Sequence, residues 1–138
     1  MNYYSIMACS SEEQVCLLAS LVLQAYAASQ IKLLRGPQRG LVMLRMRETV
    51  ANSQFNAGEI LVTEVKLELD GQFGYGMVMG DSPRRAMAVA LVDAALRKNE
   101  LVARQLEQKL AELQQQLQHN HQRLYSIAAT TRVNFEVL

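Results

Sequence analysis

The sequence has no tryptophan, only two cysteines and two prolines, and no apolar run long enough to cross a membrane. Two cysteines cannot form a disulfide framework. The longest apolar stretch, residues 15–23, is interrupted by Ser20 and reaches about half of the roughly 20 residues that a transmembrane helix needs. Glu12 and Glu13 precede it and no basic residue does, which is the reverse of a secretory signal. We therefore expect a cytoplasmic protein without a membrane span.

Charge is also scarce and balanced. The 14 Lys and Arg residues face 13 Asp and Glu residues, for a net charge of +1. A nucleic-acid-binding domain would carry clustered positive charge, so we expect no nucleic-acid partner. Apolar residues make up 50% of the sequence, which excludes a disordered chain. The 138 residues predict one domain that spans residues 1–138.

The first half of the chain predicts one helix and several strands. Ser10 and Ser11, followed by two acidic residues, are typical of a helix start, and the helix is expected to run to about residue 28. Strands are predicted over residues 31–36 and 40–47, with a turn between them that contains Pro37. Residues 49–58 are predicted to form a polar loop in which Phe55 is buried.

Residues 60–69 and 72–79 complete the predicted sheet as a hairpin at Asp70-Gly71. A two-residue loop would pair Leu69 with Gln72, whereas a three-residue loop would pair Glu68 with Gln72. We favour the second register because it gathers the apolar side chains on one face. It leaves a stripe of glycines on the other face, which indicates either a docking surface for a partner or local bulging.

The second half of the chain predicts long helices. Ser82 and Pro83 are typical of a helix start, and no glycine or proline follows. One helix over residues 83–120 would measure roughly 57 Å, so it must break or project. The leucines of this region follow a heptad seam, with Asn120 at a core position; the seam comprises Leu106, Leu110, Leu113, Leu117, Leu124 and Ile127.

Two solutions remain for this seam. The helix either breaks near residues 119–121 into a helical hairpin or lies on a partner, so that residues 101–138 project. Residues 132–138 alternate like a short strand or an extended anchoring tail. The predicted fold is therefore α+β: an N-terminal helix, a four-stranded, mostly antiparallel sheet, and a long C-terminal helix or helical hairpin with a short extended tail.

No arrangement of residues that supports catalysis is evident. His119 and His121 have no third ligand at helical spacing, so solvated side chains are favoured over a metal site. Arg84 and Arg85 at a helix start fit either an anion site or, more simply, solvated arginines. Glu59 and Glu64 are five residues apart on a strand and point to opposite faces. We predict a non-catalytic subunit.

Several motifs together resemble a known family. The segments FNAGEILVTE (residues 55–64), DGQFGYG (70–76) and ATTRVNF (129–135), within a similarity that runs from Leu34 to Asp93 and resumes near the end, resemble the PhnG subunit of the bacterial carbon–phosphorus lyase system. PhnG works in a core complex with the PhnH, PhnI and PhnJ subunits. With PhnI, PhnH and PhnL it supports attack of an alkylphosphonate on the ribose C1 of ATP. Adenine leaves and a ribose 1-alkylphosphonate 5-triphosphate forms.

The resemblance implies an accessory, hetero-oligomeric subunit in organic phosphonate catabolism. It implies that this chain binds no cofactor or metal itself and that ATP is a substrate of the complex. Glycosidic chemistry is attributed to PhnI, and PhnJ later breaks the carbon–phosphorus bond. The alternative is a homo-oligomeric coiled-coil scaffold with no part in phosphonate chemistry. The residues expected at a partner interface or shared site are Arg45, Phe55, Gly58, Glu59, Thr63, Glu64, Gly74, Tyr75, Gly76 and Phe135.

Overall fold

We describe a computed structural model of the chain that covers residues 2–47, 50–51 and 53–137, with side chains described for these except residues 44, 46–47, 55–57 and 125–137. The α+β class is confirmed over these residues. The elements follow in the order α1 (Tyr3–Cys9), α2 (Glu12–Ala25), the 3-10 turn η1 (Ala28–Gln30), β1 (Ile31–Arg47), β2 (Gln54–Leu69), β3 (Gln72–Met79), α3 (Pro83–Lys98) and α4 (Leu101–Val137).

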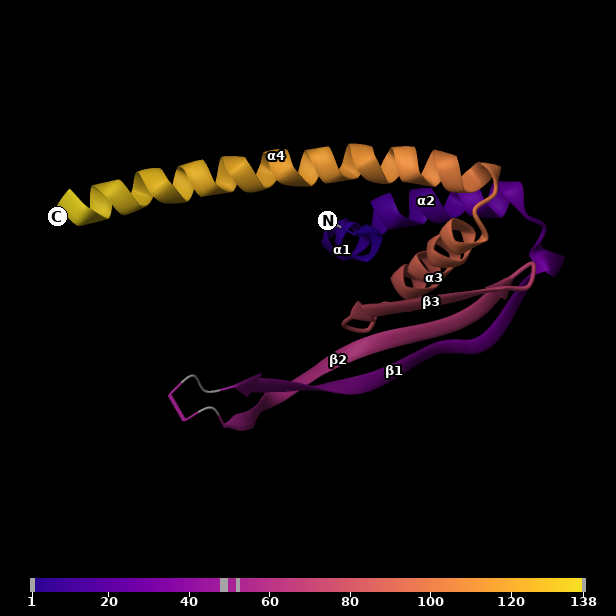
Figure 1. Cartoon of the computed structure of the whole chain (residues 1–138), viewed down its shortest axis with the longest axis horizontal. Coiled ribbons are helices and arrows are strands. Elements are labelled where there is room, and N and C mark those ends of the chain that lie inside the picture. The colour runs from indigo at the N-terminus through magenta and orange to yellow at the C-terminus, as the bar shows by residue number, and fades with distance from the viewer. Residues whose placement is uncertain (1, 48–49, 52, 138) are drawn as a thin grey trace.

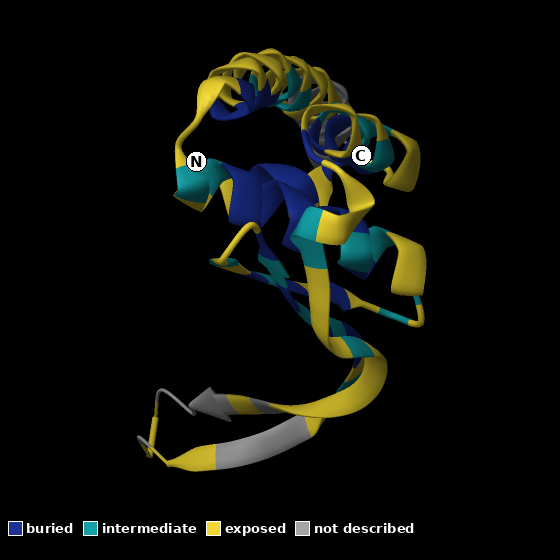
Figure 2. Ribbon diagram, turned by 90° about the vertical axis from the view of Figure 1, so that its right-hand side faces the viewer, coloured by how far each residue is buried: buried dark blue, intermediate teal, exposed yellow. Residues whose placement is uncertain are grey.

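The strands form one antiparallel sheet in the order β1-β2-β3. Helix α3 lies on one face of the sheet against β3 and β2, helices α1 and α2 cover α3, and α4 crosses above α1 and α2 (Figure 1). Burial follows these layers and is concentrated between the sheet and the helices (Figure 2). No helix in the described part of the chain covers the other sheet face (Figure 1).

The predicted fourth strand is wrong, because β1 does not turn at Gly36-Pro37. Residues 31–47 form one strand whose register against β2 shifts between Leu33 and Arg35 and again between Arg35 and Gln38. Proline has no N–H to donate, but at a sheet edge or a bulge this costs no ladder hydrogen bond. The predicted loop is likewise shorter, since residues 54–58 already belong to β2.

The hairpin between β2 and β3 also differs from the favoured register. Leu69 pairs with Gln72, so the loop has two residues, Asp70 at φ 48° and Gly71 at φ 85°. Two left-handed residues in succession are typical of the tight turn that matches the twist of a hairpin. The prediction failed because it counted apolar side chains per face and did not consider a helix lying on the glycines.

In the observed register, Gly74 and Gly76 lie opposite Leu67 and Val65, on the face that α3 covers. A Cβ on Gly74 would be 2.5 Å from the Ala90 carbonyl oxygen, and one on Gly76 would clash with the backbone of α3 in the same way. The glycine stripe therefore does mark the close approach of another backbone, but that backbone belongs to the chain itself.

Helix α4 is continuous over 37 residues, which agrees with the projecting helix and not with the alternative of a hairpin break near residues 119–121. The predicted extended tail is wrong, because residues 132–137 belong to this helix. The interruption comes earlier, at Asn99, which adopts the left-handed conformation at the end of α3. Asparagine tolerates this conformation better than most residues and can replace the usual glycine. Beyond Asn99 nothing in the sequence stops a helix, and α4 projects past α1 (Figure 1).

The N-terminal helix begins as predicted. The Ser11 hydroxyl accepts from the Gln14 N–H and the Gln14 side chain accepts from the Ser11 N–H, which together form a capping box. The helix ends at Ala25, and a further helix, α1, precedes it. None of the helices in the described part of the chain is both long and apolar enough to span a bilayer.

Candidate interaction surface

The uncovered sheet face carries a polar network at its centre. The Tyr75 hydroxyl on β3 donates to Glu64 Oε2 on β2 over 2.7 Å, and Arg35 Nη1 on β1 lies 3.3 Å from Glu64 Oε1. Burial, followed by the hydrogen bond to Glu64, raises the pKa of Tyr75 to about 12. The hydroxyl is therefore protonated at neutral pH and acts as the donor. Strand pairing thus brings together two of the residues expected at the site, Glu64 and Tyr75.

Beyond this network β1 and β2 continue as a two-stranded extension, residues 40–47 and 54–61, which we call the arm. It curves away from the helices (Figure 2). Leu41 is 65% exposed and Met43 49% exposed, and Val42 and Leu61 are also exposed. Because neighbouring side chains on a strand point to opposite faces, Val42 and Met43 make both faces of the arm apolar.

Four of the expected site residues lie on the arm: Arg45, Phe55, Gly58 and Glu59. Arg45 and Glu59 are exposed and form no ion pair among the described side chains. Gly58 lies opposite Leu44, where the register shifts before Arg45. The arm therefore offers apolar side chains beside Arg45 and Glu59, two charges of opposite sign that are unpaired among the described side chains.

Three other expected site residues are internal supports. The buried Thr63 hydroxyl donates to the Gly80 carbonyl over 2.7 Å and accepts from the Ser82 N–H over 3.0 Å, which ties β2 to the turn between β3 and α3. Gly74 and Gly76 lie beneath α3. These three residues position the outer face and are not part of it.

The two phenylalanines expected at the site have side chains outside the described residues. The backbone of Phe55 belongs to β2 and that of Phe135 to α4. The burial of Phe55 and the role of Phe135 at an interface stay predictions. The structure does, however, exclude an extended tail around Phe135.

Sequence analysis missed the carboxylate that secures the sheet edge. Asp93 of α3 is 5% exposed; its Oδ2 accepts the Tyr75 N–H at 2.9 Å and its Oδ1 accepts Arg97 Nε at 3.1 Å. This backbone N–H points outward from the edge strand, so the carboxylate takes the place that a further strand would fill. Burial and hydrogen bonding to Asp93 raise the pKa of Tyr4, which joins α1 to the same cluster. An acidic residue on the inward stripe of helix 83–98 was the available signal.

Arg85 differs from both predicted alternatives. Its Nη2 donates to the carbonyl oxygens of Met7, Ala8 and Ser10 over 3.3, 2.7 and 2.9 Å. The guanidinium places a cation at the C-terminal end of α1, where it shares the Met7 carbonyl with the Ser10 N–H and also binds the Ala8 and Ser10 carbonyls. Arg85 is thus neither a solvated side chain nor an anion site, whereas Arg84 is exposed as expected.

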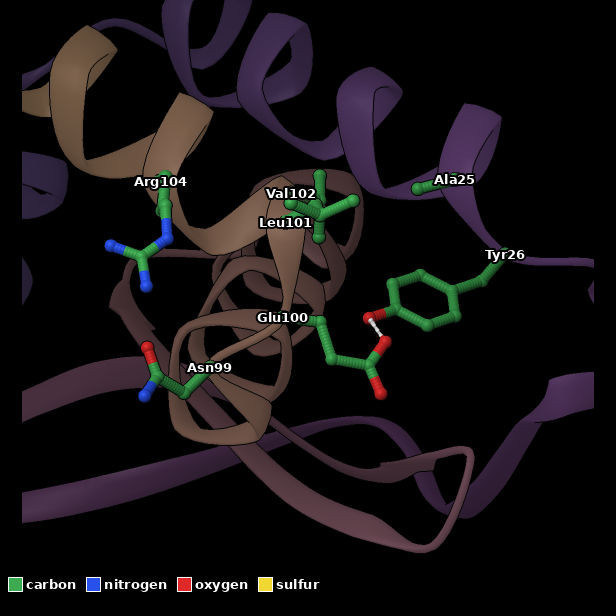
Figure 3. Close-up of a pocket in the computed structure, with 7 residues that line it drawn as sticks. All are labelled: Ala25, Tyr26, Asn99, Glu100, Leu101, Val102 and Arg104. Carbon is green, nitrogen blue, oxygen red and sulfur yellow. Dashed lines mark hydrogen bonds between the residues drawn. The ribbon is translucent and has the colours of Figure 1, made fainter.

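A hollow of about 570 Å³ lies where the end of α2 meets the link between α3 and α4. Figure 3 shows its lining, with the Tyr26 hydroxyl donating to Glu100 Oε2 over 2.6 Å. Burial, together with this hydrogen bond, raises the pKa of Tyr26 to about 12. Lys98 also holds Glu100, with Nζ 3.4 Å from Oε1. Both oxygens of the Glu100 carboxylate are therefore engaged. The residues around the hollow join the helices, and this carboxylate is not free to act as an acid or base.

Among the described residues no three His, Cys, Asp or Glu side chains gather as a metal site would require. His119 and His121 are exposed on α4, as predicted. What the molecule presents is a polar network on an open sheet face, continued by an arm that is apolar on both sides. These features fit contact with other proteins.

Comparisons with known proteins identify the family of the chain. Over residues 2–138 the chain matches the family model described as phosphonate metabolism protein PhnG. It is similar to the alpha-D-ribose 1-methylphosphonate 5-triphosphate synthase subunit PhnG of Rhizobium meliloti (strain 1021), with 38% identity over 61 residues. The matched stretch is 44% of this chain and 39% of that relative, so it spans about two fifths of the relative's length. The chain belongs to the PhnG family of phosphonate metabolism proteins.

Proposed function

We propose that this chain is an accessory subunit of the cytoplasmic carbon–phosphorus lyase core complex. It supports formation of a ribose 1-alkylphosphonate 5-triphosphate from ATP and an alkylphosphonate, with release of adenine. Its partners are the PhnI, PhnH and PhnJ subunits. The observation that carries the proposal, beside membership of the PhnG family, is an arm that is apolar on both faces and curves away from the helices (Figure 2).

An arm of this kind needs a partner. A two-stranded ribbon by itself is marginally stable in water, and exposing apolar side chains on both sides adds to the cost. A partner that covers one face would still leave Leu41 or Val42 in water, since these neighbours point to opposite sides. The arm is therefore expected to enter a partner surface or to lie between two subunits.

The distribution of polar groups favours an accessory role over a catalytic one. Glu64 is engaged by Arg35 and Tyr75, and Glu100 by Tyr26 and Lys98. Among the described side chains of the arm, Arg45 and Glu59 are the charges available to complete a site shared with another subunit. ATP in this proposal is a substrate of the assembled complex, and no cofactor is bound by this chain alone.

Co-expression with PhnI, PhnH and PhnJ tests the proposal. The chain is expected to co-purify with them, to release no adenine from ATP alone, and to be required for adenine release by the full mixture with PhnL. An untagged chain that elutes as a monomer, separate from all three subunits, would contradict the proposal.

Substitution on the arm sharpens this test. Leu41→Asp should abolish co-purification without changing the fold of the free chain, because it places a charge in the covered apolar surface. Leu101→Asp is the control, since Leu101 is 83% exposed and lies at the start of α4, away from the arm. Equal co-purification of both variants would exclude the arm as the contact.

Arg45→Ala and Glu59→Ala distinguish a role in subunit contact from a role in the reaction. In an assembled complex, unchanged turnover removes either residue from a shared site. A loss of turnover with intact assembly would assign that residue to the reaction, and the subunit would then not be purely accessory.

A further inference from the structure

The leucine seam of α4 extends farther along the helix than α1 and α2, the helices that cover it. Leu106 and Leu110 are fully buried, Leu113 and Leu117 are half-buried, and Leu124 is 66% exposed. The same heptad pattern therefore passes from core to surface along one continuous helix. Figure 1 shows the reason, because α4 runs on past the end of α1.

The exposed part of the seam is a hollowed surface. A hollow of about 610 Å³ lies along α4 between Cys9 and Leu124, with Leu117 and His121 on its lining. A second hollow of about 300 Å³ lies between α2 and α4, where Leu17 is 68% exposed beside Leu113. The apolar contact of α4 with α1 and α2 thus continues outward into an uncovered groove.

The projecting part of α4 has little to stabilise it alone. The helix has 37 residues, roughly 55 Å, and among its described side chains, residues 101–124, the buried ones end at Leu110. Helices without tertiary contacts are marginal in water, and most of their stability comes from burying an apolar face. The described part of the seam beyond Leu110 therefore needs a surface laid along it.

Charge indicates the nature of that surface. From Leu113 to Phe135 the sequence contains no Asp or Glu, and its charged residues are Arg123 and Arg132. Nearer the body, by contrast, Lys109 Nζ lies 3.8 Å from Glu112 Oε2, so the positive charge there is paired within the helix. Exposed Arg123 has no acidic residue three or four positions away.

We infer that residues 113–124 of α4 bind an amphipathic helix of a partner protein whose apolar stripe is flanked by Asp or Glu. Such a helix would bury Leu117 and Leu124 and place acidic side chains beside Arg123. A second copy of this chain would offer the seam but no acid, because its own flanks are glutamine, histidine and arginine. The inference rests on the proposed function in one respect: the partner is another subunit of the same complex.

Photo-crosslinking in the co-purified complex tests the inference. A benzophenone amino acid at position 124 should crosslink to another subunit, at a helix with acidic residues beside its apolar stripe. The same probe at Gln115, on the opposite side of α4, is the control and should give little crosslinking. Crosslinks at position 124 to a second copy, to a strand or loop, or to nothing in an intact complex would each overturn the inference. If no complex forms at all, it is the proposed function that fails.

Two variants give the size of the effect. Leu124→Asp should weaken binding to the partner roughly tenfold or more, because it charges the buried stripe. Arg123→Glu should weaken binding about threefold at low salt and less at high salt, as expected for a charge at the rim. Gln115→Asp adds a similar charge away from the seam and should bind as the parent does. Equal binding by Leu124→Asp and Gln115→Asp would overturn the inference.

Discussion

The body of this molecule and its two projections, the arm and the outer part of α4, are built from the same kinds of residue. In the body these residues are packed, whereas on the projections they are exposed. In the body, α3 lies so close to β3 that only glycine fits at positions 74 and 76. On the arm, Gly40 has open space around the position of its missing side chain. Likewise Leu106 is fully buried where α4 crosses the body, whereas Leu124 on the same seam is mostly in water. The type of a residue therefore does not show whether it belongs to the core or to an exposed surface. Its position relative to α3 and α1 decides this.

The glycine contrast gives the largest expected effect. Gly76→Val should destabilise the chain by about 4 kcal/mol or prevent folding, because the new side chain would overlap the backbone of α3. Gly40→Val on the arm should change stability by less than about 0.5 kcal/mol. Urea unfolding followed by circular dichroism measures both. Equal stability of the two variants would mean that α3 does not lie on β3 as described.

The leucine seam offers the next contrast. Leu106→Ala should cost about 3 kcal/mol because it opens a cavity beneath α4, whereas Leu124→Ala should cost less than about 0.5 kcal/mol in the free chain. Thermal unfolding of the isolated chain checks this difference. In the complex, Leu124→Ala should bind the partner subunit more weakly than the parent does. A large cost of Leu124→Ala in the free chain would show that its own helices cover the seam there.

A smaller effect is expected at the acidic residues. Asp93→Ala should cost about 2 kcal/mol, since it leaves the Tyr75 N–H and Arg97 without their acceptor. The control is Asp81→Ala, which removes an exposed ion pair of 3.5 Å with Arg39 and should cost less than about 0.5 kcal/mol. Urea unfolding at neutral pH distinguishes the two. Near-equal costs would mean that Asp93 is not the support of the sheet edge.

The smallest effect concerns Tyr75 and appears only at alkaline pH. Its pKa is raised to about 12 in the folded chain from the usual value of 10.0, so folding favours the protonated hydroxyl. The resulting stabilisation is complete below pH 10 and is lost as the pH rises through about 12. The free energy of unfolding of Tyr75→Phe should therefore fall less steeply with pH over this range than that of the parent. Glu64→Gln should lower the pKa of Tyr75 only in part, because burial is the larger cause. Urea unfolding of Tyr75→Phe across this pH range checks the first expectation, and an ultraviolet titration of tyrosinate in Glu64→Gln checks the second.

Local patterns were reliable where neighbouring residues decide the structure. The cap at Ser11, the start of α3 at Pro83 and the strand over residues 60–69 were predicted and are confirmed. Each depends on contacts within a few residues, such as a hydroxyl that accepts a nearby N–H. The exposure of His119 and His121 also followed from the absence of a third ligand nearby.

The candidate surface was predicted less well. Glu64 and Tyr75 were both named, and both take part in the network on the open face. Gly74 and Gly76 were assigned to the same surface but lie under α3, because shifting a strand by one residue moves every side chain to the other face. Asp93 was missed, and Arg85 was given the wrong surroundings. Their partners are a backbone N–H of β3 and the end of α1, which no local spacing reveals.

The sequence by itself determined the family, the α+β class and the apolar stripes of the helices and strands. These follow from motifs and periodicities that survive without knowledge of how the elements are arranged. Only the tertiary structure decided which stripes become core. Helix α3 packs on the glycine face of β3, and β1 continues through Pro37. Helices α1 and α2 end before the leucine seam of α4 does, so Leu124 remains exposed. An apolar side chain is core or interface according to what lies across from it, and that is a property of the packed chain.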